Sequence, residues 1–286
     1  MGVKATLDAR GLRPQKKWGQ HFLTDARILE SIAEIAEVGP TDAVLEIGPG
    51  LGHLTRVLAR RAGRVVAVEV DRALAAQLTA DFVDTPGVKI VYGDILKLEP
   101  FELIETGRDP TLAPAAFKVV ANLPYYITSA ILRHILQAAR RPRVVVVMVQ
   151  REVAQRMAAQ PPPMNLLAVS VQFFARVRVA RTIAAGAFYP RPKVDSAVVR
   201  LDVFDRPALS DEEAKRFFEI VRAGFGERRK QLRNSLARGL ALDSDTVADA
   251  LARARIDPAR RAETVTLDEW RALHRELARQ FTRAKL

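Results

Sequence analysis

Short apolar runs alternate with segments of helical spacing through the first half of the chain. Runs rich in Val, Ile, Leu and Ala occupy residues 43–47, 65–70, 88–92, 117–121 and 144–149. Before and between them, apolar residues recur at helical spacing over residues 24–38, 73–82 and 129–139. Nearly continuous apolar strands need cover on both faces, so this alternation predicts an α/β fold with a parallel sheet between two layers of helices.

The second half of the chain changes character. Residues 169–179 and 196–203 predict two further strands, paired antiparallel at one edge of the sheet. After Pro207 the spacing is helical, and it predicts helices over residues 212–225, 228–238, 246–254 and 267–281. We therefore expect a first domain over residues 1–204 and a small all-helical domain over residues 205–286.

Charge and composition narrow the class of protein. The formal net charge is +12 and the isoelectric point is near 10.4, which favours a polyanionic partner such as nucleic acid. The chain has no cysteine and only four His, so we expect neither a thiolate site nor a metal centre. No apolar run is long enough to span a membrane, and we expect a cytoplasmic protein without a membrane partner.

The first 20 residues are basic, and we expect them to be extended. An arm that touches phosphate is one interpretation, and a disordered tail is the preferred one for residues 1–12. Residues 1–14 lack the apolar core of a secretory signal.

A glycine turn follows the first strand directly. Gly48 and Gly50 open the sequence Gly-Pro-Gly-Leu-Gly, and such a turn lets a ligand approach the backbone closely. Glu69 ends the second strand, 21 positions after Gly48, where a carboxylate reaches the hydroxyls of a ribose. The glycine spacing departs from the pyrophosphate-binding fingerprint of dinucleotide enzymes. A nucleoside cofactor without phosphates, such as S-adenosylmethionine, fits it better.

Acidic residues recur at the ends of successive strands. Glu46, Glu69 and Asp94 lie at or near the carboxyl ends of the first three strands, where open α/β sheets bind their ligands. Asp94 can accept a hydrogen bond from an adenine amino group. A helix N-cap is the alternative interpretation of Asp94.

The sequence Asn122-Leu123-Pro124-Tyr125 ends the fourth strand at the same edge. An exocyclic amine is a poor nucleophile, because its lone pair is delocalised into the base. The Asn122 side-chain oxygen and a backbone carbonyl beside Pro124 can accept its two N–H groups and direct the lone pair at a methyl group. Tyr125 offers a ring face for stacking an unpaired base. A plain turn over a packed aromatic ring is the alternative.

Taken together, these segments resemble the S-adenosylmethionine-dependent rRNA adenine N6-dimethyltransferases, in particular their small-subunit branch. The resemblance covers nearly the whole chain and is carried by residues 16–23, 48–55, 68–71, 93–96, 122–125, 149–154, 188–196 and 225–236. It implies a Rossmann-like class I methyltransferase fold with a small C-terminal helical domain that binds rRNA. It also implies a monomer that dimethylates N6 of two adjacent adenines in 16S rRNA, within the small subunit or its precursor, during ribosome biogenesis.

The resemblance assigns roles to individual residues. S-adenosylmethionine, with S-adenosylhomocysteine as its product, is expected to contact His21 and Leu23 at its methionine end, Gly48 and Gly50 at the turn, Glu69 at the ribose, Asp94 at the adenine, and Asn122. The expected catalytic set is Asn122, Pro124, Tyr125 and Phe188, with Tyr125 and Phe188 on either side of the target adenine. The residues expected to grip rRNA phosphates are Arg228, Arg229, Lys230 and Arg233, for which a solvated helix face is the alternative.

Departures and alternatives qualify the resemblance. The family usually has Asn at the position of His21, Leu at Trp18, and Tyr-Gly near Met164-Asn165. A large-subunit rRNA dimethylase, a non-catalytic nucleic-acid binder and a DNA adenine methylase are the other candidate functions. The intact acids and the intact Asn122–Tyr125 tetrapeptide argue against the non-catalytic binder. DNA adenine methylases usually carry a second Pro in the tetrapeptide, which argues against that candidate.

Overall fold

The computed structural model describes residues 3–15, 18–23, 25–107, 116–205, 209–227 and 229–283, without the side chains of Asp211 and of residues 279–283. The chain forms two compact units, Met1–Ala154 with Arg176–Phe204 and Gln155–Ala175 with Asp205–Leu286. The sequence places residues 155–175 with the first domain, whereas here they belong to the second unit. Phe173 and Phe174 explain the difference, because their rings pack on Phe217 and Phe218 of the helical unit.

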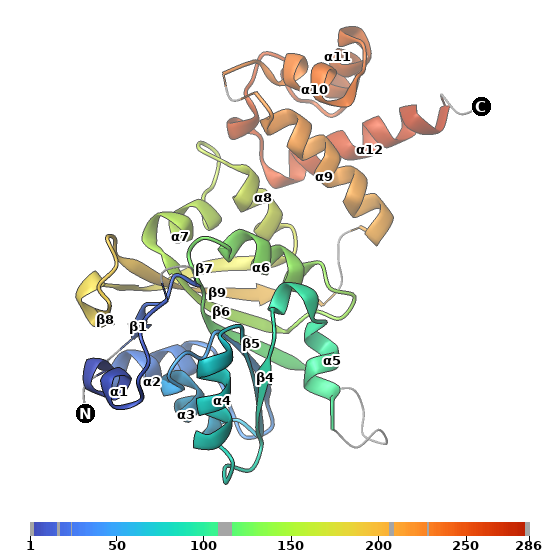
Figure 1. The fold of residues 1–286 in the computed structure, drawn as a ribbon. Coiled ribbons are helices and arrows are strands. Elements are labelled where there is room, and N and C mark those ends of the chain that lie inside the picture. The colour runs from blue at the N-terminus through green and yellow to red at the C-terminus, as the bar shows by residue number, and fades with distance from the viewer. Residues whose placement is uncertain are drawn as a thin grey trace. The chain divides into compact units, whose positions relative to one another are not determined.

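A seven-stranded sheet forms the centre of the first unit (Figure 1). Its order is β4-β3-β2-β5-β6-β9-β7, with bounds Val88–Tyr92, Arg64–Glu69, Ala43–Ile47, Phe117–Asn122, Val144–Gln150, Ser196–Val203 and Ala175–Ile183. The pairs from β4 to β6 are parallel, and β9 runs antiparallel to β6. The predicted parallel sheet with an antiparallel edge is therefore confirmed.

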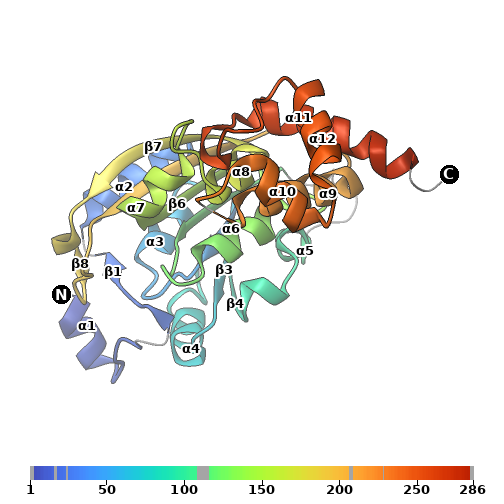
Figure 2. The same ribbon diagram turned by 90° about the horizontal axis from the view of Figure 1, so that it is seen from above.

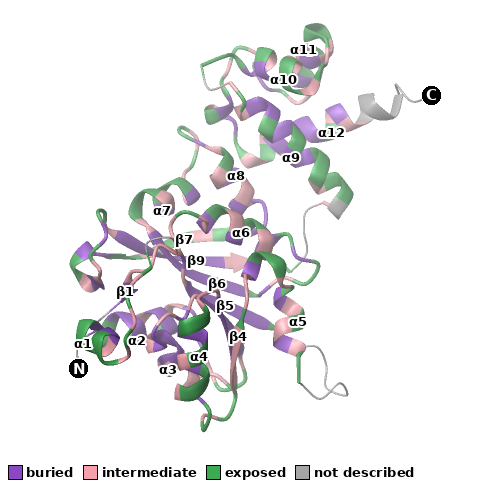
Figure 3. Cartoon of the chain, viewed as in Figure 1, coloured by how far each residue is buried: buried purple, intermediate pink, exposed green. Residues whose placement is uncertain are grey.

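Helices cover both faces of this sheet, as Figure 2 also shows. They are α2 Ala26–Ile35, α3 His53–Ala59, α4 Arg72–Asp81, α5 Pro100–Glu105 and α6 Thr128–Leu136, while α1 Val3–Ala9 packs on residues outside the sheet. Side chains of α2 and α3 form one core with alternate strand residues, among them Val44, Val120 and Val146. Figure 3 shows the result: β5, β6 and β9 are buried almost throughout. Polar side chains are therefore accommodated chiefly where the strands end, at the amino-terminal and the carboxyl-terminal ends of the parallel strands.

Two predictions of local structure are wrong. Residues 169–179 are not one strand: helix α8 covers Leu166–Gln172, and β7 begins only at Ala175. The Asn165 side chain accepts a hydrogen bond from the backbone N–H of Ala168 at 3.1 Å and so starts a helix that the apolar run alone could not reveal.

The N-terminal residues are not extended, because helix α1 covers Val3–Ala9. Val3 and Leu7 lie one helical turn apart and pack with Phe22, Leu51 and Leu74. This apolar contact orders a segment that its charge alone would leave solvated.

The second unit is helical over the part of the chain that the structure describes. Its helices are α8, α9 Asp211–Phe225, α10 Leu232–Leu240, α11 Ser244–Arg253 and α12 Leu267–Arg283, and α7 Arg151–Met157 leads into it. Helix α10 starts four residues later than predicted, with Gln231 as its N-cap. Short elements complete the chain: β1 Phe22–Leu23, β8 Phe188–Tyr189, and 3-10 turns at Ile95–Lys97, Ala185–Ala187 and Ala262–Thr264.

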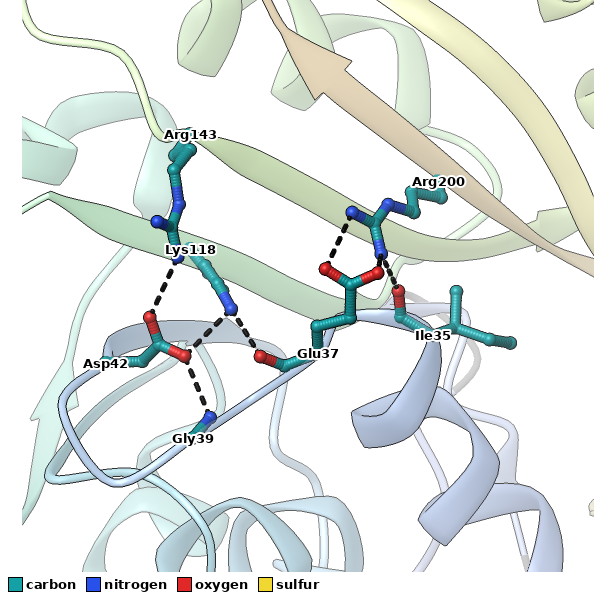
Figure 4. Close-up of polar contacts among 7 residues, drawn as sticks. All are labelled: Ile35, Glu37, Gly39, Asp42, Lys118, Arg143 and Arg200. Atoms are coloured by element: carbon teal, nitrogen blue, oxygen red, sulfur yellow. Dashed lines mark hydrogen bonds and ion pairs between the residues drawn. The ribbon is translucent and has the colours of Figure 1, made fainter.

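A polar network joins the amino-terminal ends of the central strands (Figure 4). Lys118 of β5 is 3% exposed and donates to Asp42 Oδ2 at 2.8 Å and to the carbonyl of Glu37. Asp42 also accepts from the backbone N–H of Gly39 at 2.8 Å and from Arg143 at 3.2 Å. The network joins the loop after α2 to two strands, at the end of the sheet opposite the predicted acids.

We expect Lys118→Met to lower the free energy of unfolding by roughly 3 kcal/mol, because it leaves the mostly buried Asp42 carboxylate with less compensation. Urea unfolding monitored by circular dichroism measures the change. Arg143→Met removes the exposed partner of the same carboxylate and should cost less than about 1 kcal/mol. Equal costs for the two variants would contradict the importance of the buried pair.

Candidate functional site

A cavity opens at the carboxyl-terminal edge of the sheet, where β2, β3 and β5 end. It is lined by the glycine turn after β2, by the ends of these strands and by the segment around β1. Among its lining residues are the predicted site residues His21, Leu23, Gly48, Gly50, Glu69, Asn122, Pro124 and Tyr125. These positions are spread over more than 100 residues of sequence, and the fold brings them to one place.

The glycine turn brings the backbone close to its neighbours. Gly50 has φ +58°, and a Cβ there would lie 2.9 Å from the Phe22 ring, so a larger residue would both strain the backbone and collide. The N–H of Gly50 donates to Glu69 Oε2 at 3.1 Å. The turn and the acid of the next strand are thus one hydrogen-bonded unit.

Glu69 is held rigidly at the end of β3. Its side chain accepts from Gly50 N–H and, through Oε1, from the backbone N–H of Asp71 at 2.9 Å. Burial raises the pKa of Glu69, while these two hydrogen bonds favour the charged form. Each carboxylate oxygen keeps acceptor capacity that a ribose hydroxyl can use.

Glu46 lines the same cavity from the adjacent strand β2. It is 1% exposed, and its Oε2 makes no hydrogen bond to any described residue. Burial raises the pKa of Glu46 to about 8, with a smaller contribution from the negative charge of Glu69. Burial therefore favours the protonated form of Glu46 in this structure.

Asn122 is oriented by a single hydrogen bond at the end of β5. Its Nδ2 donates to the backbone carbonyl of His21 at 3.0 Å. Since a carbonyl only accepts, the contact fixes the orientation of the amide and keeps its Oδ1 available as an acceptor. This arrangement is the one that a hydrogen-bonded amine substrate requires.

Tyr125 is anchored at its hydroxyl and at its ring. The hydroxyl lies 2.7 Å from Ser196 Oγ, and burial raises the pKa of Tyr125. The ring lies nearly parallel to that of His21, with centroids 5.7 Å apart. His21 Nδ1 donates to the carbonyl of Pro190 at 2.7 Å, which fixes the imidazole in place. The His in place of the usual Asn thus supports the Tyr125 ring.

Asp94 serves as an N-cap and lines a second hollow. Its Oδ1 accepts from the N–H of Leu96 at 3.0 Å, as the alternative interpretation predicts. Asp94 and Tyr126 also line a hollow next to the main cavity. The hollow and the main cavity share the lining residues Trp18, Gly48, Val70 and Pro124. The second carboxylate oxygen can still accept a hydrogen bond, so the two roles are compatible.

Phe188 is placed differently from the other predicted residues. It pairs with Leu23 between β8 and β1, is 4% exposed, and packs in the apolar core with α2. It is not among the residues that line the cavity. A role in stacking the target base stays a prediction, and it requires this ring to become accessible.

The predicted phosphate-binding residues lie before and at the start of α10. Arg228 lies outside the described residues. Arg229 and Lys230 are exposed, whereas Arg233 is partly buried and its backbone N–H donates to the carbonyl of Pro258. A free cationic surface is thus present at residues 229–230.

Two partners in the site were not predicted. Ser196 on β9 and the Pro190 carbonyl hold Tyr125 and His21 from a distant part of the chain. The only available signal was their position inside the segment 188–196, which the resemblance includes. Among the described residues no group of three metal-ligating side chains occurs, and no helix is long and apolar enough to cross a membrane.

Known proteins match this sequence over nearly its full length. The ribosomal RNA small subunit methyltransferase A of Dehalococcoides mccartyi strain 195 is 45% identical over 271 residues, which cover 95% of this chain and 91% of the relative. The protein of the same name from Moorella thermoacetica is 44% identical and covers 96% of both chains.

Solved structures show the same fold. A 23S rRNA methyltransferase, ErmE, superposes with a TM-score of 0.69 at 30% identity over 90% of this chain and 99% of its own. A dimethyladenosine transferase from Plasmodium falciparum reaches 0.75 at 22% identity, over 91% and 98%. The expected Rossmann-like methyltransferase fold with a helical C-terminal region is thereby confirmed.

The sequence profile of one family spans both units. It is described as ribosomal RNA adenine dimethylase, and it matches residues 11–279. Together with the relatives above, this match is decisive: the chain belongs to the ribosomal RNA adenine dimethylase family.

Proposed function

We propose that this protein transfers methyl groups from S-adenosylmethionine to N6 of two adjacent adenines in small-subunit (16S) rRNA, giving N6,N6-dimethyladenosine. The observation that carries the proposal is the fixed amide of Asn122, whose Oδ1 faces no competing donor among the described residues. The two relatives described above are both named as small subunit methyltransferases, which supports the small subunit as the target. A monomer that acts in the cytoplasm during ribosome biogenesis is the expectation that accompanies this function.

The lining residues fit the cofactor. Glu69 would hold the ribose hydroxyls, Asp94 the adenine amino group, and the glycine turn with His21 and Leu23 the methionine end. An unpaired buried acid, Glu46, lies where a positively charged ligand would satisfy it. When bound, the cofactor supplies an electrophilic methyl group on a cationic sulfur.

The chain's own residues would then prepare the adenine. Asn122 Oδ1 and a backbone carbonyl beside Pro124 accept the two N–H groups of N6, so that its lone pair turns towards the methyl group. Tyr125, held by Ser196 and His21, supplies a rigid face on which the base stacks. The amine would gain the methyl group that the sulfonium gives up and would release one proton. In the second transfer N6 retains only one N–H group, so only one of the two acceptors would hold it.

The decisive experiment offers labelled S-adenosylmethionine with purified small subunits that lack adenine dimethylation, and with large subunits in parallel. We expect N6,N6-dimethyladenosine, identified by mass, in small-subunit RNA alone. Label in the large subunit instead would establish the second candidate, which the likeness to a 23S rRNA methyltransferase supports. RNA binding without transfer to either subunit would contradict both enzymatic functions.

Asn122→Ala should lower the single-turnover methylation rate by about a hundredfold to a thousandfold, because it removes a preorganised acceptor of the reacting amine. Its dissociation constant for S-adenosylmethionine should stay within about threefold of the parent value, since the interaction matters mainly in the transition state. Rapid-quench kinetics and equilibrium binding measure the two quantities. Equal rates for variant and parent would rule out this role.

We further propose that the exposed basic segment at residues 229–230 contacts rRNA phosphates. It precedes α10 and carries two cations for which the structure shows no ion pair among the described residues. Arg233, the next predicted contact, lies at the start of the helix and is partly buried. Arg229 and Lys230 thus offer the most accessible charges of the predicted set.

Arg229→Ala combined with Lys230→Ala should raise the KM for the subunit about tenfold near physiological salt while kcat is kept. The slope of log affinity against log salt should become shallower by between one and two, because fewer counterions are released on binding. The control is Lys215→Ala with Arg275→Ala, which removes two exposed cations elsewhere in the helical unit. Equal losses in both double variants would indicate a diffuse charge effect instead.

A further inference from the structure

Glu46 is a buried acid with unmet hydrogen-bonding capacity, and the proposed chemistry does not use it. It lies in the middle of the sheet, on β2, between β3 and β5. The Oε2 atom is buried, lacks a hydrogen-bond partner among the described residues, and belongs to a side chain that lines the cavity. A buried polar atom without a partner is unfavourable, and here a ligand in the adjoining cavity would supply one.

The neighbours of Glu46 do not supply a positive charge. Thr55 of α3 lies close enough to favour the ionised form slightly, but its hydroxyl makes no hydrogen bond of acceptable geometry, and burial dominates. Glu69 on β3 is itself acidic and raises the pKa of Glu46 further. His53 of α3 lines the cavity, but burial lowers its pKa, so it is neutral near pH 7.

The remaining titratable groups around the cavity are occupied elsewhere. His21 is hydrogen-bonded to Pro190, Tyr125 to Ser196, and the Asp71 carboxylate to Gln20 and to the first turn of α4. Arg56 of α3 pairs with Asp81. Among the described residues, no cationic side chain balances the two buried carboxyl groups of the cavity, Glu46 and Glu69.

We propose that Glu46 is an ionisable counter-charge, which gives up its proton to solvent when the cationic methyl donor binds and takes one back when the uncharged-sulfur product remains. The inference rests on the proposed function. S-adenosylmethionine carries one more positive charge than S-adenosylhomocysteine, and both carry the same amino and carboxylate groups. An opposite charge a few ångströms away lowers the pKa of a carboxyl group, so the donor favours ionised Glu46 more than the product does.

Discrimination between donor and product then depends on pH. Below pH 8 the site must lose a proton to bind the donor tightly, whereas above it Glu46 is already ionised. The uncharged sulfur of the product does not favour ionised Glu46, so the acid regains its proton after the methyl transfer at neutral pH.

Isothermal titration calorimetry in buffers of different ionisation enthalpy measures the protons released. At pH 7 we expect S-adenosylmethionine to release at least about half a proton more than S-adenosylhomocysteine, and the difference should vanish near pH 9.5. The ratio of their affinities should correspondingly rise about threefold or more per pH unit below pH 8. Subtracting the product's values cancels the titration of the shared amino group.

Glu46→Gln should abolish both the extra proton and the pH dependence of the ratio, and Glu46→Asp should restore them at least in part. Glu30→Gln removes an exposed acid outside the cavity and should behave like the parent. The proposal is overturned if the parent releases no extra proton, or if Glu46→Gln releases as many as the parent. Absence of binding heat with either ligand would instead refute the proposed cofactor.

The unliganded protein provides a second readout. Between about pH 4.5 and pH 8 Glu46 is protonated in the fold but ionised in the unfolded chain, so the parent loses stability across this range and the loss ends once Glu46 ionises near pH 8. Glu46→Gln lacks this loss, and its melting temperature should therefore gain on that of the parent between about pH 5 and pH 8 and run parallel to it above. Parallel curves between about pH 5 and pH 8 would show that the pKa of Glu46 is not raised and would also overturn the proposal. Melting curves at pH 7 confirm that the variants fold.

Discussion

The exclusion of water from both faces of the central sheet is the constraint on which the rest of this structure depends. Strands such as β5 and β6 are buried between helices, so charged groups are stable chiefly where strands end. The two edges meet this constraint in different ways. At the amino-terminal edge Lys118 and Asp42 neutralise each other. At the carboxyl-terminal ends of the strands, Glu46 and Glu69 have no cationic partner among the described residues, and this difference distinguishes the structural end of the sheet from the binding end.

Hydrophobic patterning was sufficient to predict the sheet, because a strand covered on both faces must be apolar nearly throughout. It was insufficient for residues 166–172, where a short apolar run suits a buried helix as well as a strand. The cap at Asn165 settles that choice through one side-chain hydrogen bond. Charge was misleading at the N-terminus, where two apolar residues, Val3 and Leu7, order a helix within the basic first 20 residues.

The site could be predicted in its backbone positions better than in its side-chain partners. Parallel strands bring their carboxyl ends together, so Glu46, Glu69 and Asn122 are neighbours as soon as the strand order is known. The support of Tyr125 follows a different rule. Ser196 reaches Tyr125 because β9 reverses direction beside β6, and Pro190 reaches His21 because β8 pairs with β1. Neither long-range pairing leaves a local pattern in the sequence. The pairing of β8 with β1 also buries Phe188.

The two key polar groups of the cavity differ in whether their charge can change. Asn122 is neutral at every pH, and one hydrogen bond to a carbonyl fixes its orientation, so it can direct an amine in the same way in each transfer. Glu46 is fixed in position by its strand but is free to exchange a proton. A reaction that converts a cationic donor to a product with an uncharged sulfur suits this division, because geometry must stay constant while charge must not. Asn122 on β5 and Glu46 on β2 can therefore combine a fixed hydrogen-bond geometry with an adjustable charge on neighbouring strands of one sheet.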